Sequence, residues 1–399
     1  MLKIIEPNFL SISYLPSPNS TYMKKLIPIL TFIVLTLNSL NAQEQLDNFA
    51  LKIGVMARGE LNAITDVKGV KVGHTTLIEG DSVRTGVTAI LPHAGNIFQE
   101  KVPAAVFVGN GFGKFAGSTQ IAELGNLETP IILTNTLNVA TAMDAVIKYT
   151  LHLPGNENVR SVNAVVGETN DGYLNDIRGQ HVKNKDVISA IESAKSGEIS
   201  EGNVGAGTGT VCFGFKGGIG TSSRKLPENL GGYTLGVLVQ SNFGGVLQIA
   251  GVPVGQKLGN YSFHDNLLNN VDGSCMMVVA TDAPLDSRNL ERLAKRAFLG
   301  LAKTGGIASN GSGDYVIAFS TAEGMRIPHK INTETLKQEV VPNNLMSPLF
   351  MATIEATEEA ILNSLFMAET TTSFESRTIM ALPKDEVFEL LKEAGVLEE

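Results

Sequence analysis

Residues 272–283 read DGSCMMVVATDA. The run from Ser274 onward is apolar and follows an Asp-Gly pair that is typical of turns. It predicts a buried strand over residues 274–283, with Ser274 at its start. Two further apolar runs, YTLGVLVQSN at 233–242 and DYVIAFST at 314–321, predict two more buried strands.

Helical patterns separate these strands. Residues 287–303 place apolar side chains on one helix face, and residues 138–151 combine a polar start with helical spacing. Two more helices are predicted near 347–367 and 384–396. Shorter strands are predicted within residues 64–77, 85–93, 104–111 and 161–168. Clusters of strands between long helices favour the α+β class, with helices outside a strand core, over a strictly alternating βαβ sheet.

Composition narrows the possible functions. The chain has 399 residues, of which 43% are hydrophobic and 18% charged, which is enough apolar material for a large core. No stretch after residue 47 reads as a linker, so a single domain is expected over residues 43–399. A net charge of −9 without a basic stripe argues against nucleic-acid binding. Six scattered histidines and the absence of metal motifs predict neither a metal nor a cofactor. Whether Cys212 and Cys275 pair is left open.

The amino-terminal segment, residues 1–42, looks like an extension with an export signal. Two lysines at 24–25 precede the apolar run LIPILTFIVLTL, and Ala42 offers a small residue for cleavage. The run is short for a membrane span, although an uncleaved anchor is the alternative. Met23 precedes the lysines directly, so either Met1 or Met23 can be the start. The segment predicts a periplasmic or secreted protein.

The Gly273–Ser274 pair suits an attack of the chain on itself. Glycine leaves its carbonyl open, so the Ser274 hydroxyl can attack it and form an ester that water then cleaves. The new amino-terminal serine would supply both a nucleophile and a nearby amine as base. Taken alone, DGS is a common turn tripeptide. Ser222 and Lys225 match the SxxK spacing of a serine–lysine pair, and this spacing inside a glycine-rich loop is the competing candidate.

Several long motifs add a resemblance. ITDVKGVKVGHTT, VGNGFGKFAG, VVGETNDGYLND, GTGTVCFGFKGGIGTSSR, DGSCMMVVATDAPL and SNGSGDYVIAFST follow one another in fixed order. Together they resemble the DmpA family of L-aminopeptidase/D-amidase-esterases and β-aminopeptidases, from about residue 60 to about residue 392. The resemblance implies a four-layer αββα sandwich like that of amino-terminal nucleophile hydrolases, with different strand connectivity. It also implies self-cleavage into residues 43–273 and 274–399, which stay associated, and a homo-oligomer, often a tetramer.

The resemblance also assigns roles to residues. Ser274 is the implied nucleophile, and Ser312 and Asp314 of the GSGD motif complete the catalytic group. Asn242 would donate to the oxyanion, and Glu168 would accept the ammonium group of the substrate. Some members of the family carry Glu in place of Asp314.

A second departure concerns the oxyanion site, because a Tyr found in some members falls at Asn170 here. The implied reaction is hydrolysis of an amide or ester after an amino-terminal residue, through an acyl-enzyme on Ser274 and without a cofactor. Small peptides, amino-acid amides and esters are the expected substrates. A processed protein of the same fold that only binds peptides or amines is the alternative. The motifs do not decide between α-L, β and D residues.

Overall fold

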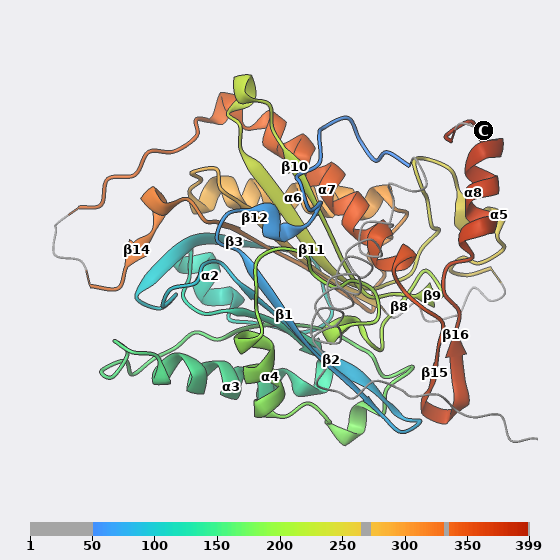
Figure 1. The fold of residues 1–399 in the computed structure, drawn as a ribbon, viewed down its shortest axis with the longest axis horizontal. Helices are drawn as coiled ribbons and strands as arrows, with labels where there is room; N and C mark the ends of the chain where they lie inside the picture. Colours follow the sequence, from blue (N-terminus) through green and yellow to red (C-terminus); the bar gives the residue numbers. More distant parts are fainter. Residues whose placement is uncertain (1–50, 265–272, 331–334, 398–399) are drawn as a thin grey trace, which may run out of the picture.

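The run after Gly273 forms the central part of a large β-sheet in the computed structural model, which describes residues 51–264, 273–330 and 335–397. Seven strands make up this sheet, in the order β10-β11-β12-β13-β3-β14, with β5 beside β3 (Figure 1). Their bounds are β3 Glu100–Gly111, β5 Asn126–Leu127, β10 Ile219–Lys225, β11 Thr234–Asn242, β12 Gly273–Thr281, β13 Ser312–Ser320 and β14 Ile327–Pro328.

Pairing in this sheet is mixed. β11 runs antiparallel to β12, β12 runs parallel to β13, and β13 runs antiparallel to β3. Every residue of β11, β12 and β13 is buried, because both faces of the sheet are covered. β12 and β13 come from the chain after Gly273 and lie between β11 and β3, which come before it.

A second sheet of five strands stacks on the first, in the order β1-β2-β6-β7-β4. The bounds are β1 Lys71–Glu79, β2 Val83–Leu91, β4 Phe115–Ala116, β6 Ile131–Asn135 and β7 Val165–Thr169. Two short hairpins complete the strands, namely β8 Val211–Cys212 with β9 Phe215–Lys216, and β15 Thr371–Ser373 with β16 Arg377–Ile379.

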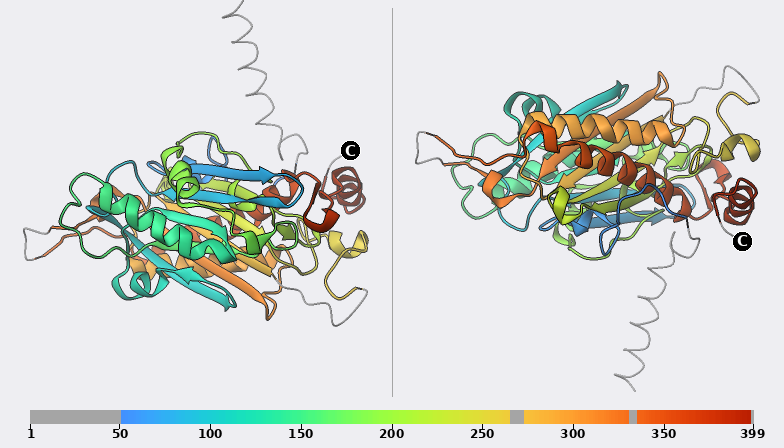
Figure 2. Two further views of the ribbon diagram at one scale, coloured as in Figure 1. Left: turned by 90° about the horizontal axis from the view of Figure 1, so that it is seen from below. Right: turned by 90° about the horizontal axis from the view of Figure 1, so that it is seen from above.

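Helices cover the outer face of each sheet. α6 (Ser287–Lys303) and α7 (Ser347–Phe366) lie over the seven-stranded sheet, and α3 (Val139–His152) and α4 (Asn184–Glu192) lie over the five-stranded one (Figures 1 and 2). α6 begins where the side chain of Asp286 accepts a hydrogen bond from the Asn289 N–H at 2.9 Å, an N-cap that satisfies a free donor of the first turn. The described residues also contain three shorter α-helices, α2 Ser118–Leu124, α5 Val254–Lys257 and α8 Lys384–Glu393.

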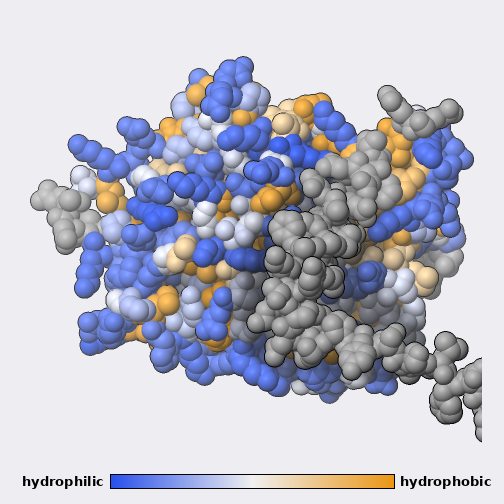
Figure 3. Space-filling view, in the orientation of Figure 1, coloured by the Kyte–Doolittle hydropathy of each residue, from blue (hydrophilic) through white to orange (hydrophobic). Residues whose placement is uncertain are grey.

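The four layers enclose three apolar cores. The alternation of side chains along β12 shows how the sheet divides them: Met277 and Val279 pack toward α6 and α7, whereas Met276 and Val278 pack between the two sheets. A third core lies between the five-stranded sheet and helices α3 and α4. On the outside, Figure 3 shows a face on which hydrophilic and hydrophobic side chains are interspersed, as is usual for folded proteins.

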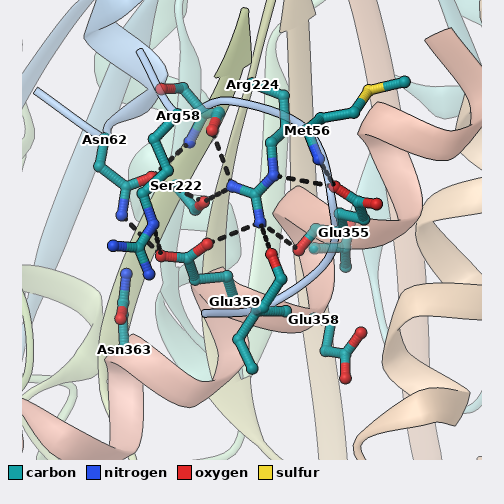
Figure 4. Close-up of polar contacts among 12 residues, drawn as sticks. Met56, Arg58, Asn62, Ser222, Arg224, Glu355, Glu358, Glu359 and Asn363 are labelled. Atoms are coloured by element: carbon teal, nitrogen blue, oxygen red, sulfur yellow. Dashed lines mark hydrogen bonds and ion pairs between the residues drawn. The ribbon is translucent and has the colours of Figure 1, made fainter. Parts of the chain in front are cut away.

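A buried ionic cluster connects the segment around residue 55 to strand β10 and helix α7 (Figure 4). Arg224 of β10 has no exposed surface, and its Nε lies 3.2 Å from a carboxylate oxygen of Glu355. Its Nη2 lies 2.6 Å from Glu359, the next acidic residue along the same face of α7. Glu355 in turn accepts hydrogen bonds from the backbone N–H groups of Val55 and Met56. These contacts fix the positions of Arg224, the two glutamates and the segment around residue 55 relative to one another.

The four-layer αββα sandwich confirms the expected fold. The predicted helix at 287–303 coincides with α6, and the strand predicted at 233–242 becomes β11. One local prediction is wrong: residues 219–225, read as part of a glycine-rich loop, form strand β10 because their small residues pack closely under α7. The predicted export signal at 1–42 lies outside the described residues. Within the described part of the chain, no helix is long and apolar enough to cross a membrane.

Candidate active site

Ser274 and Asn242 meet at one end of the seven-stranded sheet. β11 ends at Asn242, β12 begins at Gly273, and the antiparallel register sets Asn242 directly opposite Ser274. Both residues line a cavity of about 650 Å³, to which Glu168 at the end of β7 also contributes. The cavity thus lies where strands of both sheets end.

The Ser274 hydroxyl lies against the peptide bond that precedes it. Its Oγ donates a hydrogen bond of 2.6 Å to the carbonyl oxygen of Gly273 and accepts one of 3.3 Å from the backbone N–H of Gly313. A Cβ on residue 273 would lie only 2.7 Å from the Cα of Phe243. Glycine is therefore required at this position for close approach of the backbone of β11, as well as for access to its carbonyl.

The amide of Asn242 is held in one orientation. Its Oδ1 accepts a hydrogen bond of 2.9 Å from the backbone N–H of Val211, and its Nδ2 donates one of 3.0 Å to the carbonyl oxygen of Asn170. A backbone N–H can only donate and a carbonyl can only accept, so the two partners fix which end of the amide is which. The second N–H of Nδ2 remains for a group in the cavity.

Glu168 is a buried carboxylate on the cavity wall, with 3% of its surface exposed. Its Oε1 accepts the backbone N–H of Lys114 at 2.9 Å, and its Oε2 accepts the hydroxyl of Thr136. The Lys114 ammonium lies 3.8 Å from the same Oε1. A carboxylate held in this way can receive a substrate ammonium with a charge-assisted hydrogen bond.

Ser312 and Asp314 lie on the other side of the strand layer from Ser274. The Ser312 hydroxyl donates a hydrogen bond of 2.8 Å to Asp314 Oδ1. In the parallel register Asp314 lies opposite Cys275, so the pair shares the face of Cys275, and Gly313 between them lies opposite Ser274. The backbone of residues 312–314, and not the side chains of Ser312 and Asp314, therefore makes the contact with Ser274.

Burial raises the pKa of Asp314 and of the neighbouring Cys275. Desolvation raises the pKa of Asp314 to about 6, against the smaller opposing effects of the hydrogen bonds from Ser312 and from the backbone of Cys275. Burial, and next the nearby charge of Asp314, also raise the pKa of the Cys275 thiol well above its ordinary value. Cys275 points away from the cavity as expected and packs in the core together with Cys212. Both are free thiols, so the pairing left open by the sequence does not form in this structure.

Several wall residues escaped the sequence analysis. Thr136, Lys114, Val211 and Arg377 come from four separate segments of the chain. Lys114 and Val211 lie within motifs quoted above, but nothing in the sequence places them beside Glu168 or Asn242. The side chain of Asn170 forms a local turn, because its Oδ1 accepts the N–H of Gly172 at 2.9 Å. Asn170 thus contributes its carbonyl, which holds Asn242.

The competing serine–lysine pair does not come together. Ser222 and Lys225 lie three residues apart on strand β10, so their side chains leave opposite faces of the sheet. The Ser222 hydroxyl lies in the ionic cluster of Figure 4, where it donates to Asn62 Oδ1 and accepts from Arg224 Nη1, each at 2.9 Å. The Lys225 ammonium instead reaches the carbonyl of Gly232 at 2.5 Å. In the described part of the chain, no group of three His, Cys, Asp or Glu side chains could hold a metal ion.

The model of peptidase family S58 matches residues 62–379. The chain belongs to peptidase family S58. This confirms the resemblance to the DmpA family and makes the protein a hydrolase of the serine-peptidase type. Members with similar sequences include two β-peptidyl aminopeptidases. The one from Sphingosinicella microcystinivorans is 42% identical over 84% of this chain and 88% of its own, and the one from Sphingosinicella xenopeptidilytica is 37% identical with the same coverage.

Solved structures agree with the fold. The PH0078 protein of Pyrococcus horikoshii is 50% identical, with a TM-score of 0.81 over 88% of this chain and 99% of that one. A Burkholderia β-aminopeptidase is 40% identical, with the same TM-score and coverage. The L-aminopeptidase D-Ala-esterase/amidase of Ochrobactrum anthropi, described as a variant of the amino-terminal nucleophile hydrolase fold, is 35% identical, with a TM-score of 0.80 over 89% of this chain and all of that one.

Proposed function

We propose that this S58 member is an exported aminopeptidase that cleaves itself between Gly273 and Ser274 and then uses Ser274 as its nucleophile. The observation that carries the proposal is the position of the Ser274 hydroxyl, 2.6 Å from the carbonyl oxygen of the bond to be cut. Family membership and the aminopeptidase names of its relatives support the same reading.

Self-cleavage would proceed by an acyl shift. Ser274 Oγ attacks the carbonyl carbon of Gly273, the C–N bond breaks, and the hydroxyl proton passes to the departing nitrogen. The result is an ester of Gly273 on the Ser274 side chain. Water then hydrolyses that ester and leaves a carboxylate on Gly273, with a free hydroxyl and a free amine on Ser274.

The new amine of Ser274 is suited to act as the base for the hydroxyl of the same residue. An α-amino group has a pKa near 8, so roughly a tenth of it is neutral at pH 7 and can accept the proton. Ser274 would attack the substrate carbonyl, and the free N–H of Asn242 would stabilise the oxyanion that develops. The departing amine takes the proton, and water then releases the acyl group from Ser274.

Glu168 and the Ser312–Asp314 pair have supporting roles in this scheme. Glu168 would bind the ammonium group of the substrate, which restricts cleavage to the first residue of a peptide. The Asp314 carboxylate would orient Ser312 beside the bond to be cut, since residue 312 lies opposite residue 273 in the parallel register. No cofactor takes part in these steps.

The substrates would be small peptides, amino-acid amides or esters. Two of the relatives are β-peptidyl aminopeptidases, which makes peptides that begin with a β-amino acid the first class to test.

The charged and apolar pattern at 24–42 supports export to the periplasm or the medium. We extend the proposal to a homo-oligomer, a tetramer of processed pairs, on the resemblance of the motifs to the DmpA family.

Intact-mass measurement of purified wild type beside Ser274→Ala tests self-cleavage. Two wild-type fragments, one of which begins at Ser274, and one uncut mutant chain are the expected result. A folded wild-type chain that stays in one piece would overturn the proposed nucleophile. Hydrolysis of amino-acid p-nitroanilides by the cut protein separates an enzyme from a processed protein of the same fold that only binds peptides or amines.

A further inference from the structure

The cavity around Ser274 carries a cationic side chain that the proposed reaction does not use. Among the residues that the structure describes, three with charged side chains line the cavity, namely Glu168, Lys114 and Arg377. Lys114 belongs to the Glu168 end, because both its backbone N–H and its ammonium lie beside Glu168 Oε1. Arg377, on hairpin strand β16 near the end of the chain, has no part in self-cleavage or in acyl transfer.

Arg377 is held by contacts that leave its guanidinium group partly free. The guanidinium carbon lies 5.1 Å from the ring centroid of Tyr173 and 5.7 Å from that of Phe374, within the range of cation–π contacts. Its Nη1 donates to the carbonyl of Tyr173 at 3.3 Å, and its Nη2 pairs with Glu375. An arginine has five N–H donors, and these hydrogen bonds to described residues use two nitrogens of the three.

The ion pair with Glu375 is weak and leaves the positive charge of Arg377 available to bind an anion. The Glu375 side chain is 57% exposed, so solvent screens the attraction and the pair contributes little. The turn that places the arginine is strained, since Glu375 and Ser376 both have positive φ angles, of 55° and 59°. Such conformations in residues other than glycine are costly and cluster at binding and catalytic sites.

We propose that Arg377 binds the free carboxylate of a short peptide substrate, on the leaving side of the scissile bond. The inference rests on the proposed aminopeptidase function and names its substrate class: zwitterionic peptides, held by their ammonium at Glu168 and by their carboxylate at Arg377. A guanidinium group matches a carboxylate with two parallel hydrogen bonds, which a lysine cannot do. A cavity of about 650 Å³ has the size of small-ligand sites and can hold a dipeptide or tripeptide.

The test compares one short peptide with its carboxyl-terminal amide, which differ only in the group that Arg377 would bind. The processed enzyme is assayed with both, using the amino-terminal residue that gives the fastest p-nitroanilide hydrolysis. We expect kcat/KM for the free acid to exceed that for the amide by ~10- to 100-fold, mainly through KM. In Arg377→Met this ratio should fall to about one, and Arg377→Lys should keep part of it.

A matched control comes from another partly exposed arginine. Arg326 pairs with Glu100 at 2.7 Å and does not line the cavity, so Arg326→Met should keep the wild-type ratio. A wild-type ratio near one, or a ratio that survives in Arg377→Met, would overturn the inference. The inference would also be overturned if the preference for the free acid over the amide were lost in Lys114→Met but kept in Arg377→Met. The substrate carboxylate would then bind beside Lys114, at the Glu168 end of the cavity.

Failure of this inference can be told apart from failure of the proposed function. An enzyme that hydrolyses p-nitroanilides yet treats acid and amide alike keeps the proposed function and loses only the carboxylate site. A protein that hydrolyses none of these compounds loses both. Intact mass of each variant shows whether it still folds well enough to cut itself, and a fragment pattern like that of wild type qualifies the variant for the comparison.

Discussion

Asn242 lies directly opposite Ser274 across the antiparallel pair β11–β12, so both side chains leave the sheet on the same face and enter the same cavity. Asn242 has its amide fixed by Val211 on one side and by Asn170 on the other. Only one of its N–H groups is left to act in the cavity. The pair therefore sets a nucleophile beside a rigid donor on directly hydrogen-bonded strands.

Replacing Asn242 by Ala should reduce kcat by roughly 10²–10³-fold, since removal of one oxyanion donor has effects of this size. Rates with an amino-acid p-nitroanilide, measured on protein of confirmed fragment mass, give the answer. The change should fall on kcat more than on KM, because the oxyanion exists only after attack.

Asn242→Asp serves as the control for packing. Aspartate has the same shape but offers an oxygen in place of the donor, so its activity should fall as far as that of the alanine variant. Wild-type turnover in Asn242→Asp would contradict a role as oxyanion donor.

Gly273→Ala should slow self-cleavage by ~10²-fold, since small displacements of reacting groups have effects of that order. The added Cβ would lie 2.7 Å from the Cα of Phe243, a backbone atom directly after the end of β11 that cannot move aside as a flexible side chain could. The scissile carbonyl must shift as a result. Intact mass as a function of time after purification measures the rate. Gly324→Ala is the matched control, because a Cβ there meets nothing within 4 Å, and it should cut at the wild-type rate.

Turnover should decline as the pH falls through about 6, where the raised pKa of Asp314 would protonate it and weaken its hold on Ser312. A profile of kcat/KM against pH in wild type and in Asp314→Asn checks this. The variant should be less active and should lack the inflection near pH 6. An inflection that is unchanged in the variant assigns it to another group.

The same pKa has a consequence for stability. Because the pKa of Asp314 in the folded protein lies above its ordinary value of 3.8, its contribution to stability is greatest below that value and is lost as the pH rises through about 6. Asp314→Asn should therefore gain stability relative to wild type at pH 8, on the order of 2 kcal/mol more than at pH 4. Chemical denaturation at the two pH values measures the difference, and equal effects at both would contradict it.

Arg224→Met should lower the free energy of unfolding by about 3–5 kcal/mol, because it leaves Glu355 buried without its cation and removes one of the two arginines, Arg58 and Arg224, that pair with buried Glu359. Urea denaturation of the processed protein measures the loss. Lys295→Met is the comparison, since Lys295 pairs with Glu291 on the exposed side of α6 and should cost about 0–1 kcal/mol. A loss of similar size in the two variants would mean that the buried cluster of Figure 4 contributes no more than a surface pair.

Sequence reasoning reached the fold through its long, strongly patterned segments. Helix α6 and strands β11 and β12 carry periodicities that tertiary contacts reinforce, so their ends fall within about two residues of the prediction. Strand β10 was missed because its glycine and serine residues resemble a loop. Their small size in fact allows close packing, since a Cβ at Gly220 would lie 1.9 Å from the carbonyl oxygen of Ala360 in α7.

The candidate site was predictable where a motif carried it, and not elsewhere. Ser274, Asn242 and Glu168 meet as expected, since each lies at a strand end at the same edge of the sandwich. Pattern alone could not show that Ser312 and Asp314 reach the site through backbone, because that depends on register. Nor could it bring in Arg377, which lies more than a hundred residues from Ser274 in the chain and arrives on a two-stranded hairpin.

The interleaving of β11, β12, β13 and β3 has a consequence for how long the enzyme lasts. A cut after Gly273 would leave one sheet built from two polypeptides, neither of which has a complete sheet without the other. Separated, each piece would expose strand edges that favour aggregation. Unfolding of the cut molecule is then also a dissociation of its two pieces, so its midpoint should depend more steeply on protein concentration than that of uncut Ser274→Ala. Such an enzyme would fold once as a single chain, and after cleavage its lifetime would depend on how slowly it comes apart.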